Sequence, residues 1–296
     1  MRRIRLRQGL IRGLGLSKNQ LSDIGTLASI CNTHDNITMK LNWDFLNSRP
    51  QNELQDFLYY DENQLVGYLA LYIFNNKEAE VSAMVHPKYR NQGIFSILLE
   101  QAIQEVKQRK IYELLFFTDT NSNSGISALE HLQSTYEFSE YLMKWNNNLP
   151  QDMRDQLKVR VMKEDDVQDV INIDSQCFNL SKLDAEKMSQ VQLNSPTNLR
   201  FIAELNGTIV GKINVQLNNS PAYIFGFAVL PEYQGKGYGL EILQKTIVHL
   251  DNLSRNDIVL EVAVKNLNAL KLYEKVGFNK VTGYDYFRIK LAEKNS

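Results

Sequence analysis

A glycine-rich turn in the second half of the chain has the residue types that bind a diphosphate. Residues 234–239 read Gln-Gly-Lys-Gly-Tyr-Gly and follow an apolar run, 223–230, that stops at Pro231. Beyond the turn, apolar residues recur at three- and four-residue spacing: Leu240, Leu243, Ile247 and Leu250. This spacing predicts a helix. Free amides at a helix N-terminus attract an anion, and glycines let the backbone approach it closely. The run therefore predicts a strand, an anion-binding turn and a helix.

The spacing of the glycines excludes two other phosphate-binding loops. The dinucleotide fingerprint needs G-x-G-x-x-G followed by an acidic residue about 20 positions on, whereas this turn reads G-x-G-x-G. A P-loop needs Gly-Lys followed by Ser or Thr, and here Gly237 is followed by Tyr238. From the turn alone, an ordinary glycine-rich connection stays open as the alternative.

A second pattern follows the turn. Residues 260–262, Leu-Glu-Val, end a predicted strand, and residues 266–273, Asn-Leu-Asn-Ala-Leu-Lys-Leu-Tyr, begin a predicted helix that closes at Gly277 and Phe278. Together the patterns resemble two signatures of the GCN5-related N-acetyltransferase (GNAT) superfamily. The turn is similar to its acyl-CoA pyrophosphate motif, Q-x-x-G-x-G, and the later run to N-x-x-A-x-x-L-Y followed by G-F. The resemblance covers about residues 157 to 296.

The resemblance implies an α/β (α+β) fold, in which helices flank a mixed, mostly antiparallel twisted sheet. It also implies acetyl-CoA as the co-substrate. In the family, a bulged strand before the turn bonds the pantetheine arm, the amides of the turn hold the pyrophosphate, and the asparagine of the second signature contacts the cofactor near the thioester. The implied cofactor-binding residues are Phe227, Ala228, Val229, Gln234, Gly235, Lys236, Gly237, Tyr238, Gly239, Leu240 and Asn266.

Two further residues match the acid and the base that acetyl transfer to an amine needs. A protonated amine has no free lone pair, and the departing thiolate is helped by a proton donor. The resemblance implies Glu261 as the general base, acting directly or through water, and Tyr273 as the general acid. Each has a structural alternative: Glu261 can be a solvated or paired carboxylate, and Tyr273 a packed aromatic. Cys177 has no neighbouring histidine in the sequence, so a covalent cysteine intermediate is not supported.

The chain contains the same plan twice. Glycines and prolines of the two halves recur at one offset, since 211−67, 231−87 and 237−93 all equal 144. The polar run before Pro150 and the charged segment after it mark the seam. We therefore expect tandem domains: residues 1–148 as a degenerate first copy, and residues 149–296 as the catalytic copy. Strands and helices alternate in both, which favours helices packed on a sheet.

The first copy has lost the residues that carry the chemistry. It keeps Gln92 and Gly93 but continues with Ile94 and Phe95, so a bulky ring stands where the diphosphate and the backbone should nearly touch. At the same offset, the acid and base fall on apolar residues: Phe116 or Phe117, and Ala128 or Leu129. Two roles stay open for this half, namely completing a groove for the acceptor and covering a sheet edge.

Composition limits the partners and the cellular location that we expect. Lys and Arg number 33 against 34 Asp and Glu, a net charge of −1, which disfavours nucleic acid as a partner. Two distant cysteines, Cys31 and Cys177, form neither a disulfide framework nor a metal site, so no metal is expected. No run of about 18 apolar residues occurs. We expect a cytoplasmic protein that does not bind membranes, as a monomer or homodimer.

These observations predict an N-acetyltransferase that uses acetyl-CoA to acetylate a primary amine of a small molecule or of a protein N-terminus. A first alternative is a protein that binds or senses acyl-CoA without turnover, against which the pair Glu261 and Tyr273 argues. A second is an aminoacyl transferase that uses charged tRNA, against which the intact turn and the near-neutral charge argue. The sequence does not identify the acceptor.

Overall fold

The computed structural model describes residues 8–74, 77–149, 153–178, 180–193, 197–217 and 221–292. The chain forms two compact units, of which the first comprises Met1–Ser139 with Thr282–Ser296 and the second Glu140–Val281. The units are therefore not two continuous halves of the chain. The predicted boundary between residues 148 and 149 stays a prediction about where the two sequence copies meet.

The first unit is a sheet between two pairs of helices. Its elements are β1 (Gly9–Leu14), α1 (Lys18–Asp35), α2 (Trp43–Asn47), β2 (Leu54–Asp61), β3 (Gln64–Tyr72), β4 (Glu78–Val85), η1 (Pro87–Tyr89), α3 (Ile94–Gln108), β5 (Glu113–Asp119), α4 (Asn123–His131) and the first part of β6 (Thr135–Trp145). Helix α1 begins with a capping box. The Ser17 hydroxyl accepts from the Gln20 backbone amide, and the Gln20 side-chain oxygen accepts from the Ser17 backbone amide.

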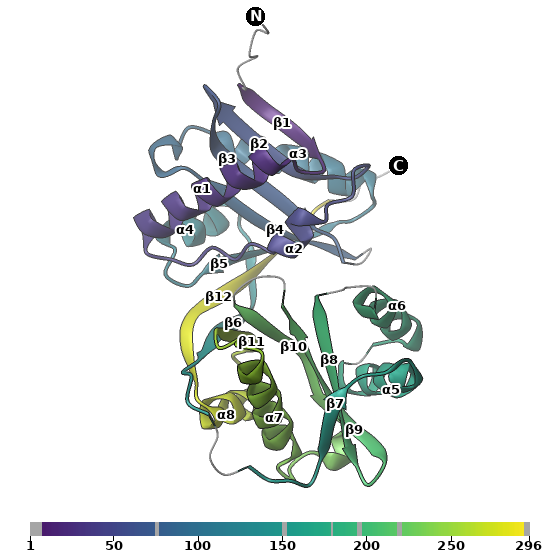
Figure 1. Cartoon of the computed structure of the whole chain (residues 1–296). Helices are drawn as coiled ribbons and strands as arrows, with labels where there is room; N and C mark the ends of the chain where they lie inside the picture. Colours follow the sequence, from purple (N-terminus) through teal and green to yellow (C-terminus); the bar gives the residue numbers. More distant parts are fainter. Residues whose placement is uncertain are drawn as a thin grey trace, which may run out of the picture. The chain divides into compact units, whose positions relative to one another are not determined.

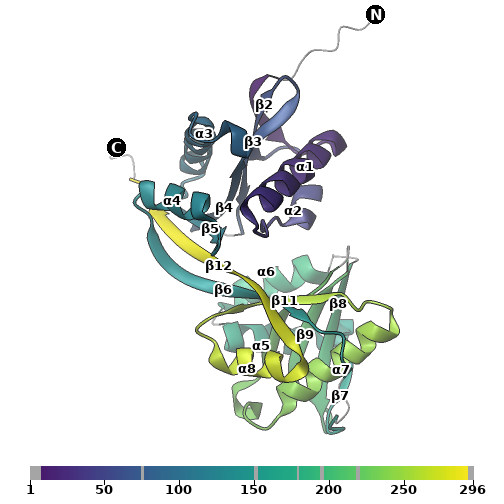
Figure 2. The same cartoon turned by 90° about the vertical axis from the view of Figure 1, so that its left-hand side faces the viewer.

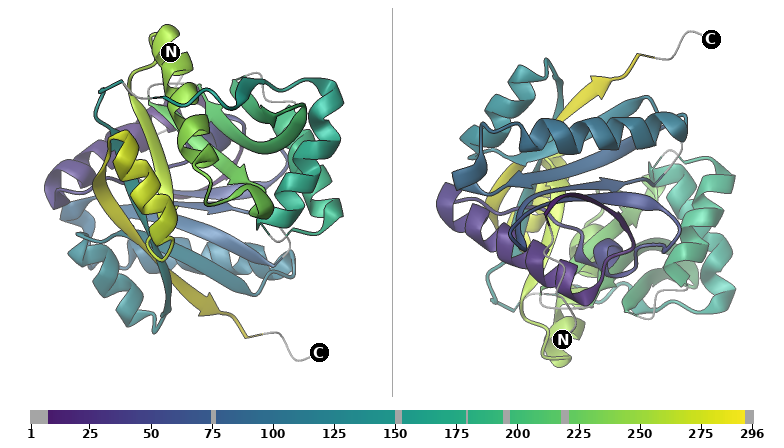
Figure 3. Two further views of the ribbon diagram at one scale, coloured as in Figure 1. Left: turned by 90° about the horizontal axis from the view of Figure 1, so that it is seen from below. Right: turned by 90° about the horizontal axis from the view of Figure 1, so that it is seen from above.

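The strand order of this unit is β1-β2-β3-β4-β5-β12, where β12 (Phe278–Lys290) is the last strand of the chain. Strands β4 and β5 pair in parallel, and the other neighbours pair antiparallel. One apolar cluster joins the sheet to α3 and α4, and a second joins its opposite face to α1 and α2. Figure 2 shows these two pairs of helices on either side of the strands, and Figure 3 shows α3 and α1 from above.

The second unit repeats the arrangement. Its elements are β7 (Lys158–Val161), η2 (Glu164–Asp166), α5 (Val167–Phe178), α6 (Lys182–Leu193), β8 (Asn198–Leu205), β9 (Thr208–Gln216), β10 (Ala222–Val229), η3 (Pro231–Tyr233), α7 (Tyr238–Asn252), β11 (Ile258–Ala263) and α8 (Leu267–Val276). The order of its strands is β6-β11-β10-β9-β8-β7, with β10 and β11 parallel and the other neighbours antiparallel. The family-implied fold class, a mixed and mostly antiparallel sheet flanked by helices, is confirmed.

The two faces of this second sheet differ in polarity. Alternate residues of β8 to β11, among them Ile213, Ile224 and Leu260, pack with α7 and α8 in the main apolar cluster. Their strand neighbours, such as Lys212, Asn214 and Glu261, point to the opposite face because successive side chains of a strand alternate. Helix α5 packs on that opposite face, and Figure 1 shows α5 and α6 across the strands from α7 and α8.

Strands β6 and β12 complete the two sheets in an order that differs from their order along the chain. Strand β12 pairs with β5 over Tyr284–Lys290 in the first unit, although it follows every element of the second. Residues 140–144 of β6 pair with β11 in the second unit, although β6 precedes β7. The chain therefore passes from one unit to the other along both β6 and β12. No local sequence pattern announces this exchange, because pairing partners are chosen between distant segments.

Candidate functional site

The glycine turn has the predicted form of a strand, a turn and a helix N-terminus. Gly235 and Gly237 adopt φ angles of 73° and 89°, in the left-handed region that favours glycine. Gly237 is the N-cap of α7, and its carbonyl accepts the first helical bond, from the Glu241 amide at 3.2 Å. The amides of the first turn of α7 consequently have no partner within the helix. These amides are the donor groups that the predicted anion site requires, and anion binding there stays a prediction.

Side chains of the turn are held back against the turn itself. The Gln234 Nε2 donates to the Val229 carbonyl at 2.9 Å, which ties the turn to the end of β10. The Lys236 ammonium donates to the Glu232 carbonyl at 2.9 Å. Tyr238 faces the ring of Tyr233, with centroids 6.5 Å apart. The backbone of the turn is thus left uncovered by its own side chains.

The glycine at position 239 is explained by the packing around it rather than by backbone strain. A Cβ atom built there would make ordinary contacts, at 3.5 Å from Leu272 Cδ2 and 3.7 Å from Phe227 Cζ. The protein itself would therefore accept alanine at this position. A side chain larger than alanine would press on Leu272 and Phe227, so packing favours a small residue at this position. Leu240, the next residue, packs partly into the apolar cluster beneath α7.

Strand β10 carries a β-bulge immediately before the turn. Phe225 pairs with Asn214 and Ala228 with Lys212, so three steps along β10 oppose two along β9. Gly226, within the bulge, has φ of 55°. Phe227 turns towards α8, whereas Ala228 is buried beside α5. The bulge leaves residues 226 and 227 outside the β9 pairing, and the Val229 carbonyl is already engaged by Gln234.

The neighbouring strand, β11, parts from β10 at the same level. The described parallel pairs end with Ile224 and Leu260. Backbone groups of Phe225 onward and Glu261 onward are therefore free of that ladder, and this is where the predicted pantetheine-binding residues lie. A polar chain inserted between the two strands would satisfy backbone groups that would otherwise lack a partner.

Glu261 lies on the face of the sheet that α5 covers. It is part-buried, and its Oε2 accepts a hydrogen bond from the Tyr223 hydroxyl at 2.9 Å. Tyr223 comes from β10, so the pair bridges the two parallel strands just before they part. The phenol fixes the orientation of the carboxylate.

Tyr273 lies on the other face of the same sheet. Its side chain is buried among apolar residues of α8, β10 and β12, with ring centroids 6.4 Å from Phe227 and 6.0 Å from Phe278. Burial raises the pKa of its phenol to about 12. The phenol is therefore a protonated group at neutral pH. Glu261 and Tyr273 therefore lie on opposite faces of this sheet.

Asn266 begins the helix that carries Tyr273. It is the N-cap of α8, and its side-chain oxygen accepts from the Ala269 amide at 3.2 Å. This bond uses the carbonyl end of the side chain. The side-chain NH₂ group stays available as a donor, and the residue is exposed. The predicted contact of Asn266 with the cofactor stays a prediction.

A residue that the sequence analysis did not single out, Arg154, lies against the turn. Its Nη1 donates to the Lys236 carbonyl at 2.9 Å. The segment from Arg154 to Leu157 is held in place by Glu241, whose Oε1 accepts from the amides of Gln156 and Leu157 at 2.9 and 2.8 Å. Because these contacts join residues more than 80 positions apart, no local pattern predicts them.

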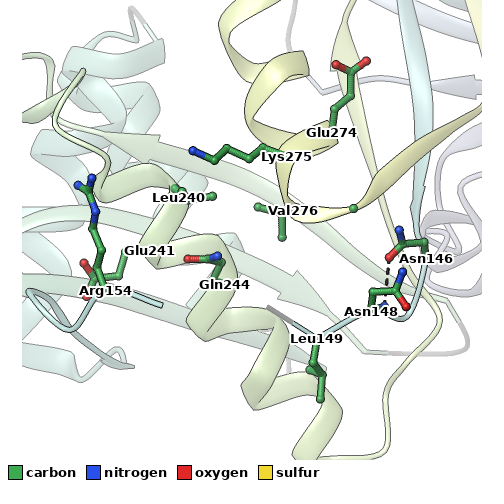
Figure 4. Close-up of a pocket in the computed structure, with 11 residues that line it drawn as sticks. Asn146, Asn148, Leu149, Arg154, Leu240, Glu241, Gln244, Glu274, Lys275 and Val276 are labelled. Carbon is green, nitrogen blue, oxygen red and sulfur yellow. Dashed lines mark hydrogen bonds between the residues drawn. The ribbon is translucent and has the colours of Figure 1, made fainter. Parts of the chain in front are cut away.

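Arg154 also lines a pocket of about 550 Å³ between α7, α8 and the segment before β7. Figure 4 shows Lys275 pointing from α8 towards the Arg154 side of this pocket. Leu240 and Gln244 line it from α7, on the face of the sheet opposite Glu261. Neither Glu261 nor Tyr273 lines the pocket, and Leu240 and Arg154 are its residues nearest to the turn.

The α5 face of the sheet contains a buried ion pair that the sequence analysis also missed. Lys212 of β9 and Asp174 of α5 are 1% and 0% exposed in their side chains, and Nζ contacts Oδ1 directly. Burial lowers the pKa of Lys212 and raises the pKa of Asp174. The sequence does show a lysine that interrupts the apolar run of β9. Its partner, Asp174, lies 38 positions away, so no local pattern indicates the pair.

Cys177 does not have the environment of an activated cysteine nucleophile. Its Sγ lies 3.5 Å from the Val229 carbonyl, and burial raises the pKa of the thiol. Raising this pKa disfavours the reactive thiolate. Among the described residues, no cluster of His, Cys, Asp and Glu suitable for a metal ion is found. No described helix is long and apolar enough to cross a membrane.

Comparison with protein families gives two matches along the chain. A model described as the acetyltransferase (GNAT) family matches residues 26–131 and again residues 167–278. A mycothiol acetyltransferase of Propionibacterium freudenreichii is 22% identical over 284 residues, which are 90% of this chain and 88% of that protein. A ribosomal protein alanine N-acetyltransferase of Haemophilus influenzae is 40% identical over 84 residues, which are 28% of this chain and 56% of that protein.

Solved structures share the two-unit fold. A GCN5-related N-acetyltransferase from Sphaerobacter thermophilus has a TM-score of 0.79 at 16% identity, covering 97% of each chain. A tandem GNAT protein from the clavulanic acid biosynthesis pathway has a TM-score of 0.74 at 12% identity, covering 97% of this chain and 99% of that one. At these identities, the likeness concerns the fold.

Proposed function

Because the chain belongs to the acetyltransferase (GNAT) family and is therefore an acyltransferase, we propose that it transfers the acetyl group of acetyl-CoA to a primary amine. The acceptor is a small molecule or a protein N-terminus. The observation that carries the proposal is a combination in the second unit: an open glycine turn, a bulged strand beside it, and the carboxylate of Glu261 held at the bulge by Tyr223.

The second unit suits acetyl-CoA in shape and in donor groups. The amides of residues 235–240 would hold the pyrophosphate, and a Cβ at Gly235 would meet no atom within 4 Å, so the turn is open there. The backbone of residues 227–229 would bond the pantetheine, and Asn266 would donate from its NH₂ group. Acetyl-CoA supplies the reactive thioester. Arg154 adds a positive charge beside the turn, where the anionic part of the ligand would lie.

Two side chains move the protons in this proposal. Glu261 takes the proton of the attacking amine as the new C–N bond forms. Tyr273, protonated at neutral pH because burial raises its pKa to about 12, donates a proton to the sulfur as the C–S bond breaks. Transfer is direct and needs no covalent enzyme adduct, consistent with the raised pKa of the Cys177 thiol. The first unit, residues 8–139 with 282–292, carries no step of this reaction.

The test is a thiol-release assay in which acetyl-CoA is mixed with a library of primary amines and the acetylated product is identified by mass spectrometry. We expect release that depends on one class of amine and is lost in Glu261→Gln. The alternative, a protein that binds acyl-CoA without turnover, predicts acetyl-CoA binding but no amine-dependent release. Acetyl-CoA binding that survives disruption of the second turn and is lost with the first would contradict the proposal.

A further inference from the structure

Arg200, on β8 of the second unit, is a part-buried cation on the polar face of the sheet. Its strand neighbours Phe201 and Ala203 belong to the α7 side. Arg200 pairs in register with Asn214, whose own neighbours Ile213 and Val215 also pack towards α7. Arg200 and Asn214 therefore share the face that α5 covers, which is also the face of Glu261.

Among the residues that the structure describes, the Arg200 side chain has neither an ion pair nor a hydrogen bond. Burial lowers its pKa, and no opposing charge acts on it. Other buried or part-buried arginines have carboxylate partners: Arg49 with Asp56, Arg90 with Asp35, Arg109 with Glu53 and Glu105, Arg160 with Asp166 and Glu204, and Arg288 with Glu78, Glu113 and Glu137. Arg200 therefore stands out among the buried and part-buried arginines as a part-buried guanidinium left available for an anion.

The surrounding charges leave the charge of Arg200 uncompensated. Lys212, two residues before Asn214 on β9, is already neutralised by Asp174 in direct contact. Burial and, to a smaller degree, the charge of Arg200 lower the pKa of Lys212, so the two cations face the same region. The cluster of Arg200, Lys212 and Asp174 therefore carries a net charge of +1 within a partly desolvated face.

Arg200 lies in one row with the proposed base. It pairs with Asn214, which pairs with Phe225 of β10. Phe225 and Glu261 each follow the last parallel pair of β10 and β11. Neighbouring strands are about 4.8 Å apart, so two spacings, about 10 Å, separate the Cα atoms of Arg200 and Phe225. Glu261 on β11 is one further strand spacing away, so three spacings, about 14 Å, separate the two strands, and an extended acceptor would span the distance between the two side chains past Phe225.

We propose that Arg200 binds an anionic group of the acceptor, so that the acceptor is an amine that also carries a carboxylate. This inference rests on the proposed function, because it specifies the substrate of that same site. The amine meets Glu261, while the guanidinium donates two parallel hydrogen bonds to the carboxylate of the same molecule. The Asn214 side chain lies between them beside the bulge, since a Cβ at Gly226 would come within 2.7 Å of its Nδ2.

The experiment compares acceptors that differ only in the anion. Amino acids of increasing chain length are each tested beside the corresponding carboxamide, with aminoalkyl phosphonates as the phosphate-like arm, in wild type, Arg200→Gln, Arg200→Lys and Arg255→Gln. Arg255 is an exposed arginine of the same unit and serves as the charge-matched control. The readout is the ratio of kcat/KM for the carboxylate to kcat/KM for its amide, because this ratio does not depend on the folded fraction of a variant.

We expect wild type and Arg255→Gln to prefer the carboxylate by about tenfold to a hundredfold, the range for a hydrogen bond to a charged group. In Arg200→Gln the ratio falls to about one, and Arg200→Lys retains part of the preference. A wild type that accepts amides equally well, prefers phosphonates over carboxylates, or keeps its preference in Arg200→Gln overturns the proposal.

The proposed function and this inference fail differently. Turnover of carboxylates and amides at equal rates preserves the acetyltransferase function and removes the role of Arg200. If no amine is acetylated, the proposed function fails, and calorimetry of the same compounds with the protein in the presence of CoA then decides. Carboxylate-dependent binding that is lost in Arg200→Gln supports the anion site, and the absence of such binding overturns it.

Discussion

The turns at residues 90–95 and 234–239 occupy equivalent positions in the two units and have nearly the same backbone. Gly93 and Gly237 have φ angles of 81° and 89°, and each is the N-cap of the helix that follows. Arg90 Nε donates to the Val85 carbonyl at 3.1 Å, just as Gln234 Nε2 donates to the equivalent Val229 carbonyl at 2.9 Å. This geometry therefore serves the reversal from strand to helix in both units and does not by itself indicate a ligand.

The difference lies in what adjoins the turn. In the first unit β4 pairs with β3 without a register shift from Gly67 to Tyr72, and its parallel pairing with β5 extends from Glu78 to Val81. In the second unit β10 is bulged opposite β9, and its described parallel pairs with β11 run from Ala222 to Ile224. Both β4 and β10 therefore continue beyond their parallel pairs, but of these two strands only β10 adds a bulge, which leaves backbone groups of residues 226 and 227 for a ligand.

The buried charges of the two units also differ in whether they have a partner. Asp56 of the first unit and Arg200 of the second occupy equivalent positions, since 200−56 equals 144. Asp56 accepts from the Tyr68 hydroxyl at 2.6 Å, and its Oδ2 lies 3.0 Å from Arg49 Nε. The polar face of the first unit is thus closed internally, whereas that of the second keeps an arginine without a partner among the described residues. This comparison favours the second unit as the one that binds ligands.

The largest effect is expected from a charge placed in the second turn. Gly237→Glu should abolish measurable acetyl-CoA binding, because a left-handed non-glycine residue costs about 1–2 kcal/mol and the new carboxylate would repel the diphosphate. Its Cβ would also displace Arg154. The matched variant, Gly93→Glu, should leave binding intact. Calorimetry with acetyl-CoA measures both, and equal losses in the two variants would remove the distinction between the turns.

Removal of the proposed base should come next. Glu261→Gln should lower kcat/KM by about 10²- to 10⁴-fold, the usual contribution of a general base, with little change in acetyl-CoA affinity. The equivalent position of the first unit is Phe117, and Phe117→Leu should leave the rate within a few-fold of wild type. Steady-state kinetics with saturating acetyl-CoA checks this. A Glu261→Gln enzyme as fast as wild type would refute the role of the carboxylate.

The buried ion pair of the second unit should matter for stability. Lys212→Met leaves Asp174 buried and unpaired, which should lower the free energy of unfolding by about 3–5 kcal/mol at neutral pH. Because burial raises the pKa of Asp174, protonation relieves the unpaired charge, so the loss should shrink as the pH falls and grow as it rises.

Urea unfolding at several pH values measures this loss. The double variant Lys212→Met with Asp174→Leu removes both charges and should recover most of the stability. A loss that is the same at every pH and persists in the double variant would point to packing rather than to charge.

The smallest of these effects is expected at the proposed acid. Tyr273→Phe should lower kcat by about 10- to 100-fold, at the low end for general acid catalysis, while the affinity for acetyl-CoA stays the same. Since the pKa of Tyr273 is raised to about 12, the wild-type rate should not decline as the pH passes the ordinary tyrosine value near 10. A decline centred near pH 10 that disappears in Tyr273→Phe would contradict the buried state of the phenol.

Much of the second unit could be predicted from local patterns. The strand expected over 223–230 is β10, and the helices expected after Gly239 and Asn266 are α7 and α8. Apolar spacing and glycine punctuation report such elements directly, because they depend on residues a few positions apart. The roles assigned to Glu261, Tyr273 and the cofactor-binding residues stay predictions until they are measured.

By itself, the sequence determined the duplicated plan with its offset of 144 residues, the strand–turn–helix order at Gly237, and the apolar residues that stand in the first half where Glu261 and Tyr273 stand in the second. Only the tertiary structure decided that β6 pairs with β11 and β12 with β5, that Tyr223 holds Glu261, that Arg154 lies on the turn, and that Arg200 lies on the face of Glu261 without a partner among the described residues. The physical reason is that strand register and long-range charge pairing join residues tens of positions apart, and no local spacing encodes which of them will meet.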